Sequence, residues 1–287
     1  MKRYLAPVLL LINLLFSSLL HAGGIEALFA PSAEPWAFWE KHSSASTKKI
    51  NHQAWDKFLN SYVIEYKDNI NRVAYDSVTT ADKQSLVDYI NALQGIDIHS
   101  YNRSEQLAYW INLYNAVTVK VILDHYPVKS IRDIDISPGF FADGPWGKKL
   151  LTIKQQAISL NDIEHRILRP IWDDPRIHYA VNCASLGCPN LRTRAYTAST
   201  VNEILDLAAR EYVNHPRGVL IDDGTLFISS IYSWFQSDFG GNEKAVIQHL
   251  KKYARPHLSN QLDKIDFING DDYDWALNDH MGKVYKQ

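Results

Sequence analysis

The segment 104–127, "SEQLAYWINLYNAVTVKVILDHYP", constrains the fold more than any other part of the chain. Its apolar residues recur at helical spacing, Ser104 is a typical helix N-cap, and Pro127 ends the pattern. Apolar side chains cover most of its circumference, which is typical of a helix buried on nearly all sides. We therefore expect a core helix here, and its most apolar face contains Leu107, Trp110, Tyr114, Val117 and Val121.

The rest of the chain predicts further helices, followed by a few short strands late in the sequence. Helical patterns with caps or an apolar stripe occur at 52–66, 80–95, 160–169, 199–215 and 243–253. Strand patterns occur at 176–181 and 264–268, and a hairpin pattern with Asp223-Gly224 at its turn occurs at 218–230. This order indicates an α+β fold, namely a mainly helical single domain with a small, mostly antiparallel sheet late in the chain.

The N-terminus has the layout of a secretory signal peptide. Lys2 and Arg3 precede an uncharged apolar run over 5–20, and small residues follow up to Ala22. An uncleaved membrane anchor is the alternative, because the run is nearly long enough to span a bilayer. We expect a signal peptide at 1–22, an N-terminal lead-in at 23–50 and a single globular domain at 51–287. The mature protein is then periplasmic or secreted.

Composition excludes several classes of function. The net charge is -2, and no run of basic residues is present, which argues against nucleic acid as a partner. Patterns typical of nucleotide, zinc-protease and calcium sites are missing from the sequence, so no cofactor is expected. The sequence has no second long apolar segment, so we expect no membrane contact beyond the signal segment. The partner is then an unidentified envelope substrate or protein, and the sequence indicates no oligomeric state.

Four blocks of the sequence, in order, resemble one known family. They are "AYWINLYNAVTVKVILDHYPVKSI", "LNDIEHRILRP", "DPRIHYAVNCASLGCPNL" and "YDWALN", which together run from about 104 to 278. They are similar to the blocks of the domain-of-unknown-function 547 (DUF547) family, in its signal-peptide-bearing bacterial form. The resemblance implies a shared fold over this core and implies no activity, so the chemistry has to be inferred from the residues.

Glu164 is the most unusual residue of the predicted helix 160–169. At about 100° per residue, Glu164 lies on the apolar face, whereas His165 and Arg169 point away from it. A carboxylate on a buried stripe has a raised pKa or needs a charged partner, and such carboxylates are enriched at functional sites. A structural ion pair is the alternative. His165 is expected to be a surface histidine.

Asn112 and Asn115 lie on one face of the predicted core helix, three residues apart. Buried asparagines must find hydrogen-bond partners. They either tie a loop to the helix or present amide donors to a substrate oxyanion.

Both cysteines of the chain lie in "DPRIHYAVNCASLGCPNL", with His178 ahead of Cys183 and Cys188. On a straight strand at 176–181, alternation places His178 and Cys183 on opposite faces, whereas Cys188 can return through a turn at Gly187. Cys188 is therefore the better nucleophile candidate. With His178 as base and Glu164 as the orienting carboxylate, it would form a thiol triad.

Two alternatives compete with a catalytic thiol at this segment. In an oxidising compartment Cys183 and Cys188 are expected to pair as a disulfide, which would add only about 2 kcal/mol of stability. A zinc site is the weaker alternative, because H-x4-C-x4-C does not match the usual ligand spacing. A long loop at 135–149, with Phe140, Phe141 and Trp146, is either a binding lip or a pinned surface loop.

The sequence therefore supports two hypotheses from different classes. The first is an exported hydrolase or acyl transferase that acts on a cell-envelope substrate, with Cys188, His178 and Glu164 in its site and Asn112 or Asn115 as donors. The second is a non-catalytic envelope binding module in which Cys183–Cys188 is a structural disulfide.

Overall fold

The structure is a computed structural model that describes residues 30–139 and 143–282. The predicted signal peptide lies outside the described residues. Within those ranges, no helix is both long enough and apolar enough to cross a membrane.

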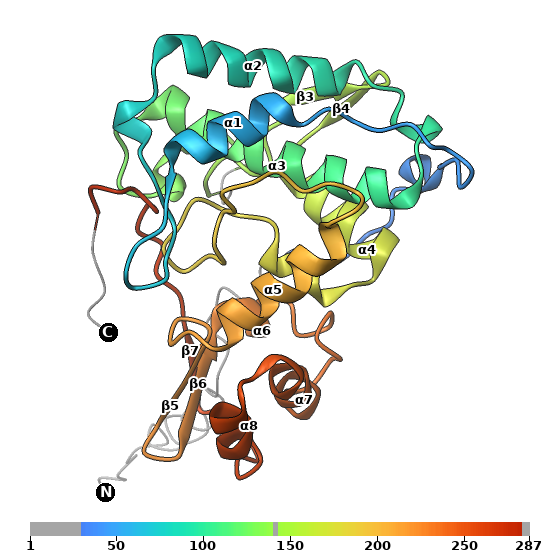
Figure 1. Cartoon of the computed structure of the whole chain (residues 1–287). Coiled ribbons are helices and arrows are strands. Elements are labelled where there is room, and N and C mark those ends of the chain that lie inside the picture. The colour runs from blue at the N-terminus through green and yellow to red at the C-terminus, as the bar shows by residue number, and fades with distance from the viewer. Residues whose placement is uncertain (1–29, 140–142, 283–287) are drawn as a thin grey trace, which may run out of the picture.

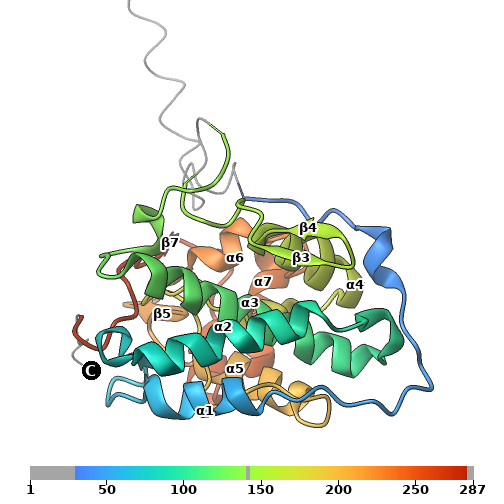
Figure 2. The same ribbon diagram turned by 90° about the horizontal axis from the view of Figure 1, so that it is seen from above.

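The protein has a mainly helical α+β fold in which α1 (Gln53–Tyr62), α2 (Thr80–Gln94) and α3 (Arg103–His125) form one layer (Figures 1 and 2). The predicted core helix is confirmed, because nearly every α3 side chain between Glu105 and Val119 is buried. Its N-cap is Asn102, whose side chain accepts a hydrogen bond from the Glu105 amide at 3.0 Å. The predicted cap, Ser104, lies inside the helix instead.

Three small sheets accompany the helices. β1 (Val63–Ile64) pairs with β2 (Arg72–Val73), and β3 (Leu151–Ile153) pairs with β4 (Gln156–Ile158); neither pair was predicted. The late sheet has the order β5-β6-β7, and its elements are β5 (Val219–Asp222), β6 (Thr225–Ser229) and β7 (Gly270–Asp272). β5 and β6 form the predicted hairpin, because Asp223 and Gly224 both adopt the positive φ that a tight hairpin turn requires.

In the described part of the chain, the apolar core consists of two clusters. The first contains the buried faces of α1, α2 and α3, and the second is built by the late sheet and the helices that follow the cysteines. These helices are α5 (Val201–Val213), α6 (Ser230–Trp234), α7 (Glu243–Tyr253) and α8 (Pro256–Leu262). Figure 1 shows α7, α8 and the late sheet at the opposite end of the molecule from α1 and α2. α5 joins the two ends, because Leu205 packs in the first cluster and Tyr212 in the second.

Both strands predicted outside the hairpin are wrong. Residues 264–268 form a turn and an irregular segment, and the third strand is β7. The segment around His178 is the 3-10 helix η7 (Pro175–Tyr179), started by Asp174, whose side chain accepts a hydrogen bond from the Arg176 amide at 2.9 Å. Pro175 favours this helical start because its φ is fixed in the helical range. The part of the chain that the structure describes has four further short 3-10 helices, namely Ala37–Glu40, Tyr75–Ser77, Ile98–Ser100 and Ile131–Asp133.

The C-terminal segment 273–279 returns from β7 to the first half of the molecule, as the red trace in Figure 1 shows. The Leu186 amide donates to Ala276 O at 2.8 Å, and the Asn278 amide donates to Ala184 O at 3.1 Å. The late "YDWALN" block therefore lies directly against the cysteine segment. This contact joins two of the sequence blocks that are far apart in the chain.

Candidate active site

A pocket of about 550 Å³ brings together the histidine and cysteine residues that the sequence singled out. One side, called here the imidazole wall, consists of Glu164, His165 and His178, with Arg169 and Asp238 behind them. The other side, called the sulfur wall, consists of Cys183, Cys188 and Tyr273, with Ser185 behind them.

Glu164 and His165 belong to a π-helix, Asp162–Leu168, which continues into α4 (Arg169–Trp172). The Arg169 amide donates to Glu164 O, five residues back, rather than four as in an α-helix. Pro170 gives the physical reason, since it has no amide to donate and its ring would clash with a carbonyl four residues back. The wider turn lets the helix continue through Pro170, whereas the predicted helix ended at residue 169, directly before this proline.

The carbonyls that this wider turn frees are paired with the chain before α1. The Glu34 amide donates to His165 O at 3.0 Å, and the Trp36 amide donates to Arg166 O at 3.1 Å. The π-helix therefore leaves neither carbonyl unsatisfied, which buried backbone groups require. Such π-turns occur often at functional sites.

The prediction that His165 is a surface residue is wrong, because His165 is only 6% exposed and lines the pocket beside Glu164. The prediction assumed 100° per residue, and the π-turn changes that angle. Burial lowers the pKa of His165 to about 4, so its ring is neutral at pH 7. Its Nδ1 accepts a hydrogen bond from the Arg169 guanidinium at 3.0 Å.

His178 is held by a carboxylate that sequence reasoning missed. Its Nε2 lies 2.8 Å from Oδ2 of Asp238, and the Arg169 guanidinium donates two hydrogen bonds to the same carboxylate at 2.6 and 2.9 Å. The His178 ring also stacks on Phe235, with ring centroids 4.4 Å apart. These contacts fix the position and orientation of the imidazole.

The ionisation of Asp238 determines which nitrogen of His178 carries the proton. Burial alone would raise the pKa of Asp238, but the hydrogen bonds and charges of His178 and Arg169 outweigh burial and hold this pKa well below its usual range. An ionised carboxylate only accepts hydrogen bonds, so Nε2 is the donor. In the neutral ring, Nδ1 is then the basic atom, and it faces Glu164 Oε1 at 3.8 Å.

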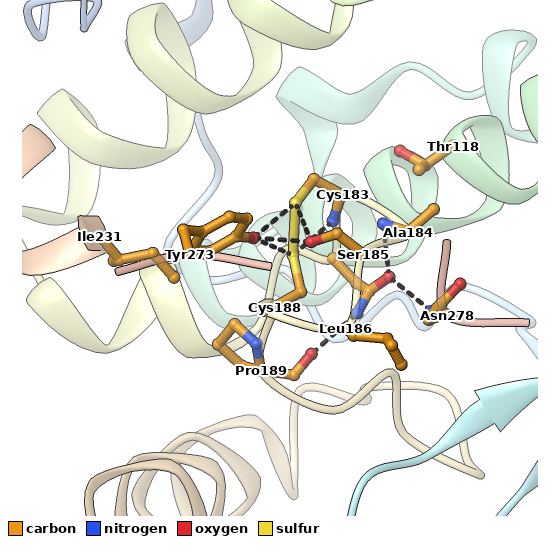
Figure 3. Close-up of a disulfide and its surroundings, with 12 residues drawn as sticks. Thr118, Cys183, Ala184, Ser185, Leu186, Cys188, Pro189, Ile231, Tyr273 and Asn278 are labelled. Carbon is orange, nitrogen blue, oxygen red and sulfur yellow. Dashed lines mark hydrogen bonds between the residues drawn. A yellow bond between two sulfur atoms is a disulfide. The ribbon is translucent and has the colours of Figure 1, made fainter. Parts of the chain in front are cut away.

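The sulfur wall contains the disulfide Cys183–Cys188, and no free cysteine occurs in the described chain (Figure 3). Cys183 is partly exposed, whereas Cys188 is only 3% exposed. The preference for Cys188 as nucleophile depended on a strand that the structure does not contain. Cys183 is therefore the more exposed of the two residues.

Hydrogen bonds to its carbonyls hold the cysteine segment in place independently of the disulfide. Tyr212 Oη donates to Gly187 O at 2.6 Å, and Arg217 donates to Leu186 O at 3.0 Å. The side-chain Nδ2 of Asn182 donates to Pro189 O at 2.8 Å. Each donor is a side chain outside the closed loop 183–188. Side chains outside the loop therefore hold it in addition to the sulfur–sulfur bond.

Asn112 and Asn115 tie backbone segments to α3. Asn112 donates to Tyr196 O at 2.8 Å and accepts from the Tyr196 amide at 3.0 Å. Asn115 donates to Ala180 O at 2.9 Å and accepts from the Asn182 amide at 2.8 Å. Neither side chain lines the pocket. This geometry favours the structural interpretation of the pair, and Asn115 positions the chain between His178 and Cys183.

Three tryptophans line part of the pocket and contact one another. Trp146 of the predicted lip meets Trp275 edge to face, with ring centroids 5.7 Å apart, and Trp275 stacks on Trp234 at 5.6 Å. Phe140 and Phe141 lie outside the described residues. Within residues 30–139 and 143–282, no group of three or more His, Cys, Asp or Glu side chains has an arrangement that would hold a metal ion.

Asp238 could have been suspected only from its local setting. It lies in the polar, glycine-containing stretch "QSDFGGN" directly after an aromatic helix, a typical setting for a functional loop. Nothing in the sequence pairs it with His178, which lies 60 residues earlier.

Comparison with known proteins finds one similar family for part of the chain. Residues 98–213 match the model of the family described as "Protein of unknown function, DUF547". No curated protein and no solved structure matches the chain. The matched segment contains Glu164, His178 and both cysteines, whereas Asp238 and Tyr273 lie beyond it. Over residues 98–213, the chain is similar to the DUF547 family.

Proposed function

We propose that the protein is an exported thiol-dependent hydrolase or acyl transferase, with Cys183 as nucleophile and His178 as base. The observation that carries the proposal is the fixed imidazole of His178, held by Asp238 in the same pocket that the partly exposed Cys183 lines. A nucleophile, a base and an orienting carboxylate are the three parts of a thiol triad. Asp238 takes the orienting role that sequence reasoning gave to Glu164.

The reaction begins with reduction of the disulfide by a dithiol, which is itself oxidised to a disulfide and leaves Cys183 and Cys188 as thiols. Nδ1 of His178 then takes the proton of the Cys183 thiol, and the thiolate attacks an acyl carbonyl. The carbon–leaving-group bond breaks, and the imidazolium returns its proton to the leaving group. Water or an acceptor nucleophile cleaves the resulting thioester and restores the thiol.

Reduction also supplies the freedom of movement that this chemistry needs. Among the described residues, no hydrogen bond joins His178 to either sulfur. Once the bond to Cys188 is broken, the Cys183 side chain can rotate about its Cα–Cβ bond while the surrounding carbonyls keep the loop in shape. Rotamer changes of this kind require no backbone movement.

Glu164 faces Nδ1 of His178 at 3.8 Å from inside the pocket. Its negative charge would stabilise the imidazolium that forms when the thiol is deprotonated. We therefore assign to Glu164 the role of stabilising the protonated His178 ring.

The alternative is a non-catalytic binding module, which the disulfide itself favours. A structural disulfide adds least, however, where hydrogen bonds already hold a loop, as they do at 183–188. The export of the protein remains part of the proposal. A disulfide is compatible with a periplasmic or extracellular location, where such bonds persist.

The test is acylation by p-nitrophenyl acetate, followed by release of p-nitrophenolate and by intact mass. We expect reduced wild-type protein to form an acetyl adduct, and Cys188→Ala to form it without reductant. Cys183→Ser should form none, and His178→Ala should react about 100-fold more slowly or worse. His257→Ala, which removes an exposed histidine far along the chain in α8, is the matched control.

Three results would contradict the proposal. Equal acylation of Cys183→Ser and wild type would exclude Cys183 as the nucleophile, and loss of acylation in Cys188→Ala alone would give that role to Cys188. Absence of any adduct in reduced wild-type protein and in Cys188→Ala would favour the binding module.

A further inference from the structure

We propose that Tyr273 is a catalytic residue of this site, in which its hydroxyl donates a hydrogen bond to the Cys183 thiolate and Ser185 supports that hydroxyl from behind. The inference rests on the proposed thiol chemistry, and it adds a residue that lies outside the segment matched by the family.

The Tyr273 hydroxyl lies directly over the disulfide (Figure 3). Its Oη is 3.0 Å from Cys183 Sγ and 3.1 Å from Cys188 Sγ. No other tyrosine in the described chain has a hydrogen bond to either sulfur. The one polar hydrogen of this tyrosine is therefore placed where negative charge develops when a sulfur becomes a thiolate.

The direction of the neighbouring hydrogen bond leaves that hydrogen available. Ser185 Oγ donates to Tyr273 Oη at 2.9 Å, so Tyr273 accepts on one side and donates on the other. A chain of two hydroxyls polarises the terminal donor and strengthens its bond to an anion. Ser185 is almost fully buried, which shields the chain from water.

Tyr273 stays protonated across the working pH range. Burial raises its pKa well above the usual value, and the smaller lowering by Ser185 and Arg217 does not reverse that shift. A protonated phenol is a donor to a thiolate, whereas a phenolate would repel it.

The ring of Tyr273 is also held firmly. It contacts Trp275 and Trp234, with ring centroids 4.7 and 4.8 Å away. On the other side it packs against Gly187, where an added Cβ would come within 3.0 Å of the ring and 2.9 Å of the Asp274 amide. Gly187 is therefore required for close approach of the C-terminal segment, and this approach places the hydroxyl on the sulfurs.

A hydrogen bond from a fixed donor to a thiolate lowers the thiol pKa, because it stabilises only the charged form. Charge-assisted hydrogen bonds are strong enough to shift a pKa by about one unit or more. Removal of the Tyr273 hydroxyl should therefore make alkylation of the thiol about tenfold slower at pH 6, with a smaller difference at pH 9, where the thiol ionises without help.

The experiment measures the rate of iodoacetamide alkylation against pH in a Cys188→Ala background, which leaves Cys183 as the one thiol. We expect Tyr273→Phe to move the midpoint of this profile upward by about one unit and Ser185→Ala to move it upward by less. Tyr126→Phe is the matched control. It removes a hydroxyl that donates to Asp279 at 2.7 Å in the same C-terminal segment, and it should leave the profile unchanged.

The profile separates failure of this inference from failure of the proposed function. An unchanged midpoint in both Tyr273→Phe and Ser185→Ala would overturn the inference, even if His178→Ala raised the midpoint and acylation were observed. An upward shift in Tyr273→Phe would support it even if p-nitrophenyl acetate left no adduct. If Tyr273→Phe loses the near-ultraviolet circular dichroism of the folded chain, the Ser185→Ala profile alone decides, and no shift there overturns the inference.

Discussion

The two walls of the pocket are built on different physical principles. The imidazole wall depends on charge, since His178, Asp238 and Arg169 form a buried, mutually paired set and His165 is kept neutral beside it. The sulfur wall depends on hydrogen bonds that side chains donate to backbone carbonyls and on a tyrosine hydroxyl over the sulfurs.

This difference determines what each wall tolerates. A buried charge that loses its partner is costly, because the remaining charge has neither water nor a counter-ion. A loop that several separate hydrogen bonds hold loses only one of them when a single contact is removed. The imidazole wall should therefore be sensitive to substitution and to pH, and the sulfur wall should be sensitive to oxidation state with little change in fold.

The largest expected effect comes from breaking the charge set of the imidazole wall. Arg169→Met keeps much of the side-chain volume and leaves Asp238 without its guanidinium, so we expect a loss of about 3 kcal/mol in the free energy of unfolding. Urea denaturation at pH 7 measures it. Arg192→Met removes the ion pair with the exposed Glu211 and should cost less than about 1 kcal/mol. Equal losses in the two variants would show that burial of the Arg169 pair has no special weight.

The next effect tests the neutral His165. Its pKa is about 4 in the folded protein and about 6.5 when unfolded, so the unfolded chain binds more protons between these values. Stability is fully present above pH 6.5 and is lost as the pH falls toward 4. Between pH 7 and pH 5 this one histidine should account for about 2 kcal/mol, which follows from the shift by linkage.

Comparison of wild type with His165→Gln isolates that contribution. His52 and His249 also have pKa values lowered to about 4 by burial, so the variant keeps part of the pH dependence. The loss of stability on going from pH 7 to pH 5 should be smaller in His165→Gln than in wild type, while the exposed-site variant His257→Gln keeps the wild-type loss. Identical losses in all three proteins would mean that folding leaves the pKa of His165 unchanged.

The smallest effect belongs to the sulfur wall. The double variant Cys183→Ser/Cys188→Ser removes a short closed loop, and we expect it to lose at most about 2 kcal/mol, because so short a loop restricts the unfolded chain only slightly. Near-ultraviolet circular dichroism should remain that of the folded protein, since Tyr212 and Arg217 still hold the loop. Failure to fold would show that the disulfide does determine the loop's shape.

Local patterns predicted the elements whose structure depends on neighbouring residues alone. α3 and α7 follow from apolar spacing, and α7 has the predicted bounds, Glu243–Tyr253. The β5–β6 hairpin follows from Asp223-Gly224, whose positive φ values are needed whatever packs around it. The small sheets of β1 to β4 were missed, because strands of two or three residues carry too few positions for an alternation pattern.

The errors lie at the site, where distant segments override local preference. The π-turn at Asp162–Leu168 needs Pro170 from its own sequence, but it also needs the amides of Glu34 and Trp36 to donate hydrogen bonds to its freed carbonyls. The angle of 100° per residue that we assumed for 160–169 takes no account of partners from a distant segment. The predicted outward position of His165 was wrong for that reason.

The sequence by itself determined the helical core, the late hairpin and the short segment in which His178 precedes both cysteines, because each depends on residues close together in the chain. Only the tertiary structure decided that Asp238 holds His178 and that Tyr273 lies over the sulfurs. Those contacts span 60 and 90 residues. They arise because packing of α6 and the C-terminal segment against the cysteine loop fixes the side chains in space, and no local pattern encodes that packing.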